Sequence, residues 1–279
     1  MKERYIDLHM HSTVSDGTYT PQELVQMALG RNLSAIALTD HDSAEGVRVA
    51  QQAADGTGLE VVPGVELSTY DGQEMHILGY FIQPENAALK QYLESMAHSR
   101  LERVQAMVRK LSGNGFSISW EEVRRRAQHM VSRVHIAQSL VEKGYAASVG
   151  EAFDCLIGEG KPYFVRRQQI KPQEAIQAIH EAGGLAVLAH PYFLHCDAAL
   201  EERLRRLPEL DGIECHYPRH TQEQCEEYQR LARKFRLLET GGSDFHGANR
   251  PEAEMGIGCC GRKIPYEYLE KMKQKTSKR

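Results

Sequence analysis

Long apolar segments, a strong net charge and paired cysteines are all missing from this sequence of 279 residues. No run approaches the roughly 18 apolar residues that a membrane-spanning helix requires. The 34 Lys and Arg against 38 Asp and Glu leave a net charge of −4, so no broad basic surface is expected to hold DNA stably. The six cysteines contain no C-x-x-C pair, which excludes a disulfide framework or a zinc finger. We therefore expect a soluble, cytoplasmic protein with reduced thiols and no membrane partner.

Short apolar runs alternate with helical patterns, which is typical of a mainly parallel sheet or barrel. Helices are predicted near 21–31, 172–182 and 221–234. The first of these starts with a capping box, Thr20 to Glu23, that has proline at the first helical position. The predicted strands are Tyr5–Leu8, Ala35–Leu38, Glu60–Val62, His76–Phe81, Leu185–Leu188, Gly212–Cys215 and Leu237–Glu239.

The interval between the fourth and fifth predicted strands lacks a strong strand pattern. Apolar residues recur there at helical spacing, and Ser119 and Ser148 each begin a possible capping box. We therefore predict an all-helical insertion, residues 84–165, in a discontinuous barrel formed by residues 1–83 and 166–265. Residues 266–279 form a tail, whose basic end Lys271–Arg279 is expected to be disordered.

Histidines and carboxylates stand at the ends of nearly all predicted strands. His9 and His11 follow the first strand two residues apart, so their side chains project to the same side and can share a cation. Asp16 could join a metal cluster or make a turn with the following glycine. The second strand is followed by His41, a candidate ligand, which we expect Asp40 to support. Asp42 is interpreted as a helix cap.

The later strands add further candidates. Glu66 interrupts an apolar segment, where a carboxylate is costly to bury unless it is paired or binds metal, and its two oxygens could join two cations. His76 starts an apolar strand and could be a ligand or a core residue. Together the candidates are too many for one four-coordinate ion and suit two or three divalent metals. They are His9, His11, Asp16, His41, Glu66, His76, His190, Asp244 and His246.

Five motifs resemble those of the polymerase and histidinol phosphatase (PHP) superfamily: His9-x-His11, Thr39–Asp42, Gly64–Glu66, Ala189–Pro191 and Gly242–Gly247. The sequence is most similar to stand-alone bacterial metal-dependent phosphoesterases, which include nucleoside bisphosphate and monophosphate phosphatases. The resemblance implies an α/β fold, a distorted (β/α)7 barrel with a helical insertion, and a site for three metals. It implies one metal on His9, His11, Glu66 and Asp244, a second on Glu66, His76 and His190, and a third on Asp16, His41 and His246.

Clustered divalent ions lower the pKa of bound water and neutralise charge in phosphoryl displacement. The expected nucleophile is therefore a metal-bridging hydroxide held by Glu66, Asp16 and His41. The metals expected are Mn, Zn or Fe, because imidazole and carboxylate ligands accept all three. Ser243 is interpreted as a turn or supporting residue rather than as a nucleophile.

Substrate contacts are expected from the insertion. Ser132 can cap a helix whose first turn carries Arg133 and His135, a combination suited to an anion, although an ordinary capped helix fits equally. The resemblance places Arg133 and His135 at a substrate phosphate, but Val134 replaces the usual proline. Arg167 could add a second phosphate contact or lie in a solvated basic patch. His195 and His220 are candidates for reaching the pocket.

The leading hypothesis is a phosphatase for small nucleotides, either a 3′,5′-bisphosphate or a 5′-monophosphate. Two other activities remain open: a 5′-3′ exoribonuclease on short RNA and a histidinol-phosphate phosphatase. A metal-binding module without catalysis is a hypothesis from another class, against which the complete set of nine candidate ligands argues.

Overall fold

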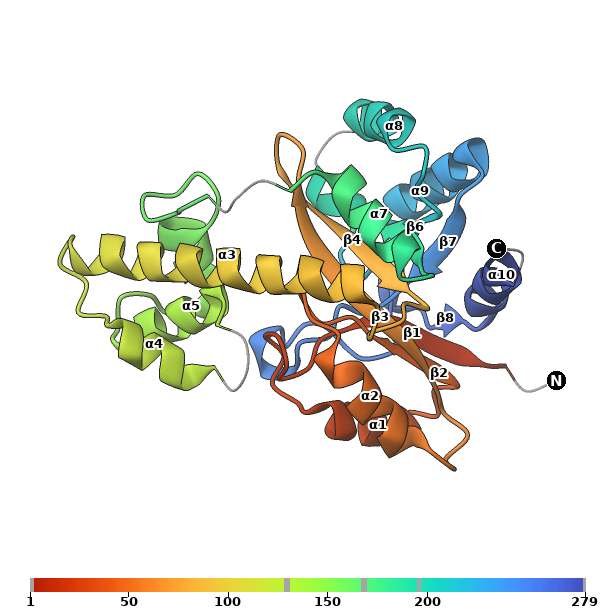
Figure 1. The fold of residues 1–279 in the computed structure, drawn as a ribbon, viewed down its shortest axis with the longest axis horizontal. Coiled ribbons are helices and arrows are strands. Elements are labelled where there is room, and N and C mark those ends of the chain that lie inside the picture. Colours follow the sequence, from red (N-terminus) through yellow and green to blue (C-terminus); the bar gives the residue numbers. More distant parts are fainter. Residues whose placement is uncertain (1–2, 128–130, 167–169, 195–196, 278–279) are drawn as a thin grey trace.

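The computed structural model describes residues 3–127, 131–166, 170–194 and 197–277. Arg167, a predicted substrate contact, and His195, a candidate for reaching the pocket, lie outside these ranges. Eight strands form one sheet in the order β7-β6-β5-β4-β3-β2-β1-β8. The sheet curls into a nearly closed barrel with helices around it and a helical layer to one side (Figure 1). The His11 amide donates to the Phe245 carbonyl over 2.9 Å, which joins β1 to the segment after β7.

Seven strands coincide with the predicted ones, and the α/β barrel is confirmed. β4 runs antiparallel to both of its neighbours, which distorts an otherwise parallel arrangement. The eighth strand has two residues and pairs antiparallel with β1, and the sequence did not predict it. The strands are β1 (Tyr5–Met10), β2 (Ala35–Leu38), β3 (Glu60–Tyr70), β4 (Glu74–Tyr80), β5 (Leu185–Leu188), β6 (Gly212–His216), β7 (Leu238–Gly241) and β8 (Ile264–Pro265).

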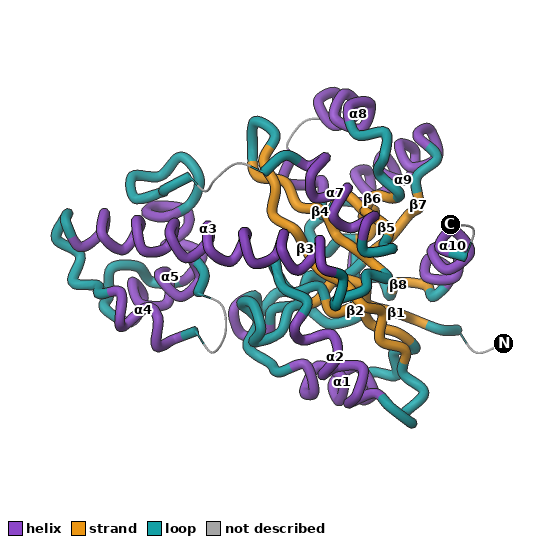
Figure 2. The backbone as a smooth tube through the Cα atoms, viewed as in Figure 1, coloured by secondary structure: helices purple, strands orange, loops and turns teal. Residues whose placement is uncertain are grey.

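Outside the insertion, the described residues form six α-helices, which lie around the sheet (Figure 2). The predicted capping box of the first helix is present: Thr20 Oγ1 accepts from the Glu23 amide, and Glu23 accepts from the Thr20 amide. None of the described helices is long and apolar enough to cross a membrane. The helices are α1 (Pro21–Gly30), α2 (Glu45–Ala54), α7 (Pro172–Glu181), α8 (Asp197–Arg206), α9 (Gln222–Phe235) and α10 (Glu267–Thr276).

In the interval predicted to be helical, the described residues form four α-helices and a π-helical turn. α3 connects it to the barrel (Figure 1). Near its start Leu89 packs in the barrel core, whereas Val104, Met107 and Leu111 belong to a separate core inside the insertion. One continuous helix thus fixes the insertion to the barrel, and the division of the chain at residue 84 stays a prediction. The helices are α3 (Ala87–Ser112), α4 (Trp120–Arg126), α5 (Arg133–Glu142), α6 (Val149–Ala152) and the turn Phe153–Ile157.

The expectation of a disordered basic tail is wrong for most of its length. Residues Glu267–Thr276 form α10. Leu269 and Met272, three residues apart and fully buried, pack in the same core as β1 and β2. The two apolar side chains at helical spacing therefore fix this helix on the barrel, and Lys271, Lys273 and Lys275 each pair with a carboxylate.

Asp211 joins α10 to the barrel and allows a test of this packing. Its carboxylate accepts from the Ala186 amide over 2.9 Å and lies 2.8 Å from His180 and 3.0 Å from the Lys275 ammonium. Burial opposes ionisation, but these hydrogen bonds lower the pKa of Asp211 to about 2. Because this pKa lies below the ordinary value of 3.8, the stabilisation is complete above about pH 4 and is lost as the pH falls toward 2.

We expect Asp211→Asn to lower the free energy of unfolding by about 1–2 kcal/mol at neutral pH, and by less as the pH falls below about 4. Urea denaturation of the chelator-treated protein across this range measures the difference. Asp55→Asn, an exposed position at the end of α2, is the matched control. If the difference in the free energy of unfolding between the wild type and Asp211→Asn did not become smaller below about pH 4, the stabilisation would not come from the charge of Asp211.

Candidate metal centre

Glu66 is the centre of the predicted ligand cluster. Its side chain is completely buried in the middle of β3, and each carboxylate oxygen faces a different set of imidazoles. This division is the one expected of a carboxylate shared by two cations. Oε2 lies 3.4 Å from His9 Nε2, 3.2 Å from His11 Nε2 and 3.0 Å from His41 Nδ1, and Oε1 lies 2.8 Å from His76 Nδ1 and 2.9 Å from His190 Nε2.

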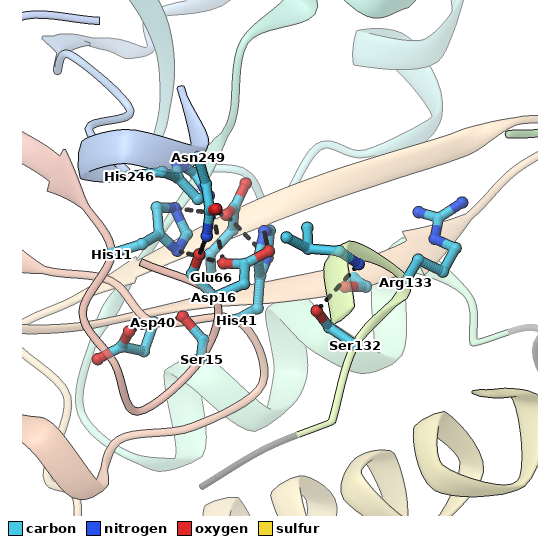
Figure 3. Close-up of polar contacts among 12 residues, drawn as sticks. His11, Ser15, Asp16, Asp40, His41, Glu66, Ser132, Arg133, His246 and Asn249 are labelled. Atoms are coloured by element: carbon cyan, nitrogen blue, oxygen red, sulfur yellow. Dashed lines mark hydrogen bonds and ion pairs between the residues drawn. The ribbon is translucent and has the colours of Figure 1, made fainter. Parts of the chain in front are cut away.

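Asp16 and Asp244 also face imidazoles of the cluster. Asp16 Oδ1 is 3.3 Å from His246 Nε2, and Asp244 Oδ1 is 3.2 Å from His11 Nε2. The second oxygen of Asp244 accepts from the Tyr217 hydroxyl and pairs with Arg250, so its first oxygen is aimed at the histidines. Figure 3 shows Asp16, His41, Glu66 and His246 converging from separate segments of the chain.

The nine predicted ligands thus come together at one end of the barrel, and eight of them form three groups whose ligand atoms lie within 4.8 Å of one another. The first group is the one implied by the resemblance. In the others, His11 joins the Asp16 group, and His41 stands where His190 was expected, although His190 also contacts Glu66. The groups are His9, His11, Glu66 and Asp244; His11, Asp16, His41 and His246; and His41, Glu66 and His76.

The donor set fits divalent cations. Six buried ligand atoms have no hydrogen-bond partner among the described residues, and leaving polar atoms so is costly unless something else binds them. Imidazole nitrogens and carboxylate oxygens in this number suit Mn, Zn or Fe. The atoms are His9 Nε2, His11 Nδ1 and Nε2, Asp16 Oδ1, His41 Nδ1 and Glu66 Oε2.

The electrostatics of the cluster favour cations. Burial opposes ionisation of Asp16, Glu66 and Asp244, yet the surrounding imidazoles, together with Arg250 beside Asp244, hold the pKa of each carboxyl well below its ordinary value. Burial also opposes protonation of His11, but Asp244 and Glu66 raise its pKa to about 9. The carboxylates therefore stay charged, and cation binding would release protons from imidazoles such as that of His11.

Two buried carboxylates behind the cluster escaped the sequence analysis. Glu214, in the middle of β6, lies 3.0 Å from His9 Nδ1 and accepts from the His190 amide over 2.7 Å. Asp7, in β1, accepts from the amides of Ser243 and Gly256. Both residues are carboxylates inside apolar strands, which is the feature that identified Glu66. The same criterion applied to every strand would have found them.

Of the supporting roles expected for Asp40, Asp42 and Ser243, the structure shows only that of Ser243. The support of His41 by Asp40 is wrong: Asp40 accepts from the hydroxyls of Ser12 and Ser15 and so holds the loop that carries Asp16. Asp42 is not a helix cap, because the N-cap of α2 is Ala44. Ser243 donates its hydroxyl to Asp7 over 2.5 Å, a supporting contact of the kind expected.

Asp42 instead connects three elements. Its backbone is left-handed, with φ of 50°, which an L-residue adopts at a cost. The carboxylate accepts from the Ser68 amide over 3.0 Å and pairs with Arg100 of α3. The loop that holds His41 is thereby attached both to β3 and to the insertion.

The cluster opens into a cleft of about 410 Å³ between the barrel and the insertion. Arg133 lines it, and the Ser132 hydroxyl caps α5 by accepting from the Val134 amide. His135 Nδ1 accepts from the Ser132 amide over 2.9 Å, so a contact of His135 with substrate stays a prediction. His220 is buried with Nδ1 against the Cys215 carbonyl, and it is not among the described residues that line the cleft.

Comparison with known proteins identifies the family. The model of the PHP domain family matches residues 7–187. The chain belongs to the PHP domain family. This PHP protein is 34% identical over 250 residues to a 5′-3′ exoribonuclease of Haemophilus influenzae, covering 88% of this chain and 91% of that protein. It is 34% identical over 257 residues to a 3′,5′-nucleoside bisphosphate phosphatase of Chromobacterium violaceum, covering 90% of each.

A solved structure with the same fold supports the family assignment. A Bifidobacterium adolescentis protein proposed to be a metal-dependent phosphoesterase superimposes with a TM-score of 0.86 at 29% identity, over 96% of this chain and 95% of that one. The resemblance seen in the five motifs is therefore confirmed. This PHP protein is a metal-dependent phosphoesterase.

Substitution of Glu214 tests whether the residues behind the cluster position its ligand side chains. A carboxylate that accepts from a ligating imidazole fixes the ring and raises its basicity. We expect Glu214→Gln to weaken manganese binding by about 10- to 100-fold, measured by equilibrium dialysis. Glu239→Gln, the same change on the neighbouring strand β7, should leave the affinity unaltered. Equal affinity in the wild type and Glu214→Gln would contradict the positioning role.

Proposed function

We propose that this PHP protein removes phosphate from small nucleotides, with a nucleoside 3′,5′-bisphosphate or 5′-monophosphate as substrate. The observation that carries the proposal is the position of the ligand cluster, which forms the floor of a cleft whose walls hold Arg133 and Arg250. Five of the nine candidate ligands line this cleft together with the two arginines, so a phosphate bound there would lie near both the cations and guanidinium groups. Such a place suits a phosphomonoester better than a neutral substrate.

The nine ligands would hold two or three divalent ions, Mn, Zn or Fe. When bound, these ions supply Lewis acidity and lower the pKa of water toward neutrality. The side chains keep this centre rigid: Glu66 is immobilised in β3, and Glu214 orients His9. Arg250 holds Asp244, so the carboxylate is oriented before any cation binds. Preorganisation of this kind avoids a reorganisation cost during the reaction.

The insertion supplies the rest of the substrate contacts. Arg133 stacks near Phe153 and Phe164, with its guanidinium carbon 5.5 and 5.9 Å from the two ring centres. Phe153 and Phe193 line the cleft from opposite parts of the chain. Aromatic faces suit a nucleobase, because stacking on them is favourable for every base. These contacts support a nucleotide over a substrate without a base.

Exoribonuclease activity on short RNA is the second candidate. It is supported by the similarity to the Haemophilus influenzae exoribonuclease, and a 5′-phosphorylated end would occupy the same cleft. Histidinol phosphate fits less well, since its imidazole offers a smaller stacking surface to the two phenylalanines. A non-catalytic module is disfavoured, because five of the nine candidate ligands line the cleft rather than a sealed core.

Phosphate release by the manganese-loaded protein tests the proposal. The panel contains adenosine 3′,5′-bisphosphate, AMP, histidinol phosphate and a 5′-phosphorylated RNA dinucleotide. We expect release from the first two, complete loss with chelator, and a loss of at least about 100-fold in Glu66→Gln. Glu60→Gln, at the start of the same strand, is the control. Turnover of none of the four by a metal-loaded protein would overturn the proposed function.

Arg133 tests the substrate side separately. Removal of one charge-assisted hydrogen bond to phosphate should raise KM by roughly 10- to 100-fold in Arg133→Ala. Metal content, measured by plasma emission, should stay unchanged because Arg133 is not a ligand. Arg125→Ala, an exposed position on α4, controls for the loss of a charge from the insertion. A loss of metal with an unchanged KM would contradict a role of Arg133 in substrate binding.

A further inference from the structure

Three thiols gather on the barrel in a place that the phosphoesterase reaction does not use. Cys259 and Cys260 begin a short 3-10 turn before β8, and Cys225 lies near the start of α9. The Cys259 thiol donates to the carbonyls of His220 and Thr221 over 3.4 and 3.6 Å, where α9 begins. The three cysteines are not among the described residues that line the cleft. Their chemistry is therefore independent of substrate binding.

The backbone brings two of these thiols together. Side chains of adjacent residues ordinarily point apart in extended chain. Cys260, however, has a left-handed backbone with φ of 55° and ψ of 32°, which an L-residue adopts at a cost, and Gly261 follows with φ of 71°. The Sγ atoms of Cys259 and Cys260 lie 3.3 Å apart. The contact between the two sulfurs is thus built by a specific turn.

The two sulfurs differ in their access to solvent. Cys260 is exposed, whereas Cys259 is only 2% exposed. Burial raises the pKa of the Cys259 thiol above its ordinary value, so this sulfur stays protonated at neutral pH. A reagent from solvent therefore meets Cys260 first, with Cys259 directly behind it. An accessible thiol beside a second cysteine that can resolve it is typical of cysteines that respond to oxidants.

We propose that Cys259 and Cys260 form a site of reversible oxidation, whose oxidising substrate is a hydroperoxide such as hydrogen peroxide. The O–O bond of the peroxide breaks as one oxygen is added to Cys260 Sγ, which gives a sulfenic acid and one water. Cys259 Sγ then attacks this sulfur. The S–O bond breaks, an S–S bond forms, and the thiol proton leaves with the hydroxyl as a second water. Two thiols thereby supply the two electrons that reduce the peroxide.

The geometry of adjacent cysteines makes this bond easy to reverse. Consecutive Cα atoms are about 3.8 Å apart, which is less than the roughly 4.4–6.8 Å that disulfides usually span. A bond formed outside the usual range is strained and therefore readily reduced by other thiols. The turn that carries Cys259 and Cys260 must also rearrange to accept it.

The same loop reaches the back of the metal centre. Gly256, three residues before Cys259, donates its amide to Asp7 over 2.7 Å. Asp7 also accepts from the amide and the hydroxyl of Ser243, the residue before the candidate ligand Asp244. A rearranged turn would disturb the hydrogen bond from Gly256 and with it the support of this ligand. We therefore expect the oxidised protein to bind divalent cations less tightly than the reduced protein.

Mass spectrometry of the peroxide-treated protein tests for the bond. Free thiols are blocked with iodoacetamide, and the peptide that contains both Cys259 and Cys260 is isolated. We expect this peptide to lack two hydrogens and to carry no blocking group until dithiothreitol is added, after which it takes up two. Cys155, an exposed thiol of the insertion, is the internal control and should keep its blocking group or gain oxygen. Two blocked thiols in the peptide after peroxide treatment would overturn the proposal.

Serine variants assign a role to each thiol. Cys259→Ser should leave Cys260 as a sulfenic acid that dimedone traps, and Cys260→Ser should form no disulfide. Cys225→Ser removes the other thiol in contact with Cys259 and should still form the bond between the neighbours. A disulfide that persists in Cys260→Ser and disappears in Cys225→Ser would assign the chemistry to Cys225 and overturn the proposal.

Equilibrium dialysis with manganese measures the effect on the metal centre without any turnover. Loss of one buried hydrogen bond behind the cluster corresponds to binding that is about 2- to 10-fold weaker in the oxidised wild type. Reduction, followed by removal of the reductant, should restore the affinity. Peroxide-treated Cys259→Ser controls for oxidation elsewhere in the chain and should bind manganese as tightly as the untreated variant. Equal affinity of the oxidised and reduced wild type would overturn the link to the metal centre.

Discussion

The burial of one carboxylate imposes the arrangement around the site. Glu66 lies at the centre of β3 with no exposure to water, and five imidazoles face its two oxygens. An isolated charge in such a place would cost several kcal/mol, so the chain must supply compensating positive charge there. Imidazoles do this in part when protonated, and divalent cations would do it more completely. The barrel's strand ends converge on Glu66, and this is the physical reason that residues from β1 to β7 act as one unit.

A consequence is that the supporting residues matter almost as much as the ligands. Each wall of the cluster is held by a polar contact that reaches back into the barrel: Glu214 behind His9, Asp7 behind Ser243, and Arg250 on Asp244. Asp40 holds the loop of Asp16 through two serine hydroxyls. These supporting contacts favour one conformation, because any alternative would leave a buried carboxylate behind the cluster without its partner.

Much of the centre could be predicted from local sequence, because its residues stand at the ends of strands where period and turn residues are easy to recognise. Glu66 is recognisable as a charged residue in an apolar run, and Glu214 shares this feature. By contrast, the ion pair of Asp42 with Arg100 joins residues 58 positions apart, and no local pattern reveals it. β8 has two residues, too few for a periodic pattern. α10 was missed because its lysines concealed the short apolar stripe of Leu269 and Met272.

The contact between Asp42 and Arg100 also connects the loop of the metal cluster to the insertion. Asp42 adjoins His41 of the cluster, and Arg100 lies on α3, which packs in the barrel core at its start and in the insertion core beyond. A shift of α3 would therefore also move the loop of His41. The barrel supplies the candidate metal ligands, and the insertion contributes Arg133 and Phe153 to the wall of the cleft. Since these two sets of residues lie on separate segments of the chain, the lining of the cleft can change while the cluster keeps its side chains.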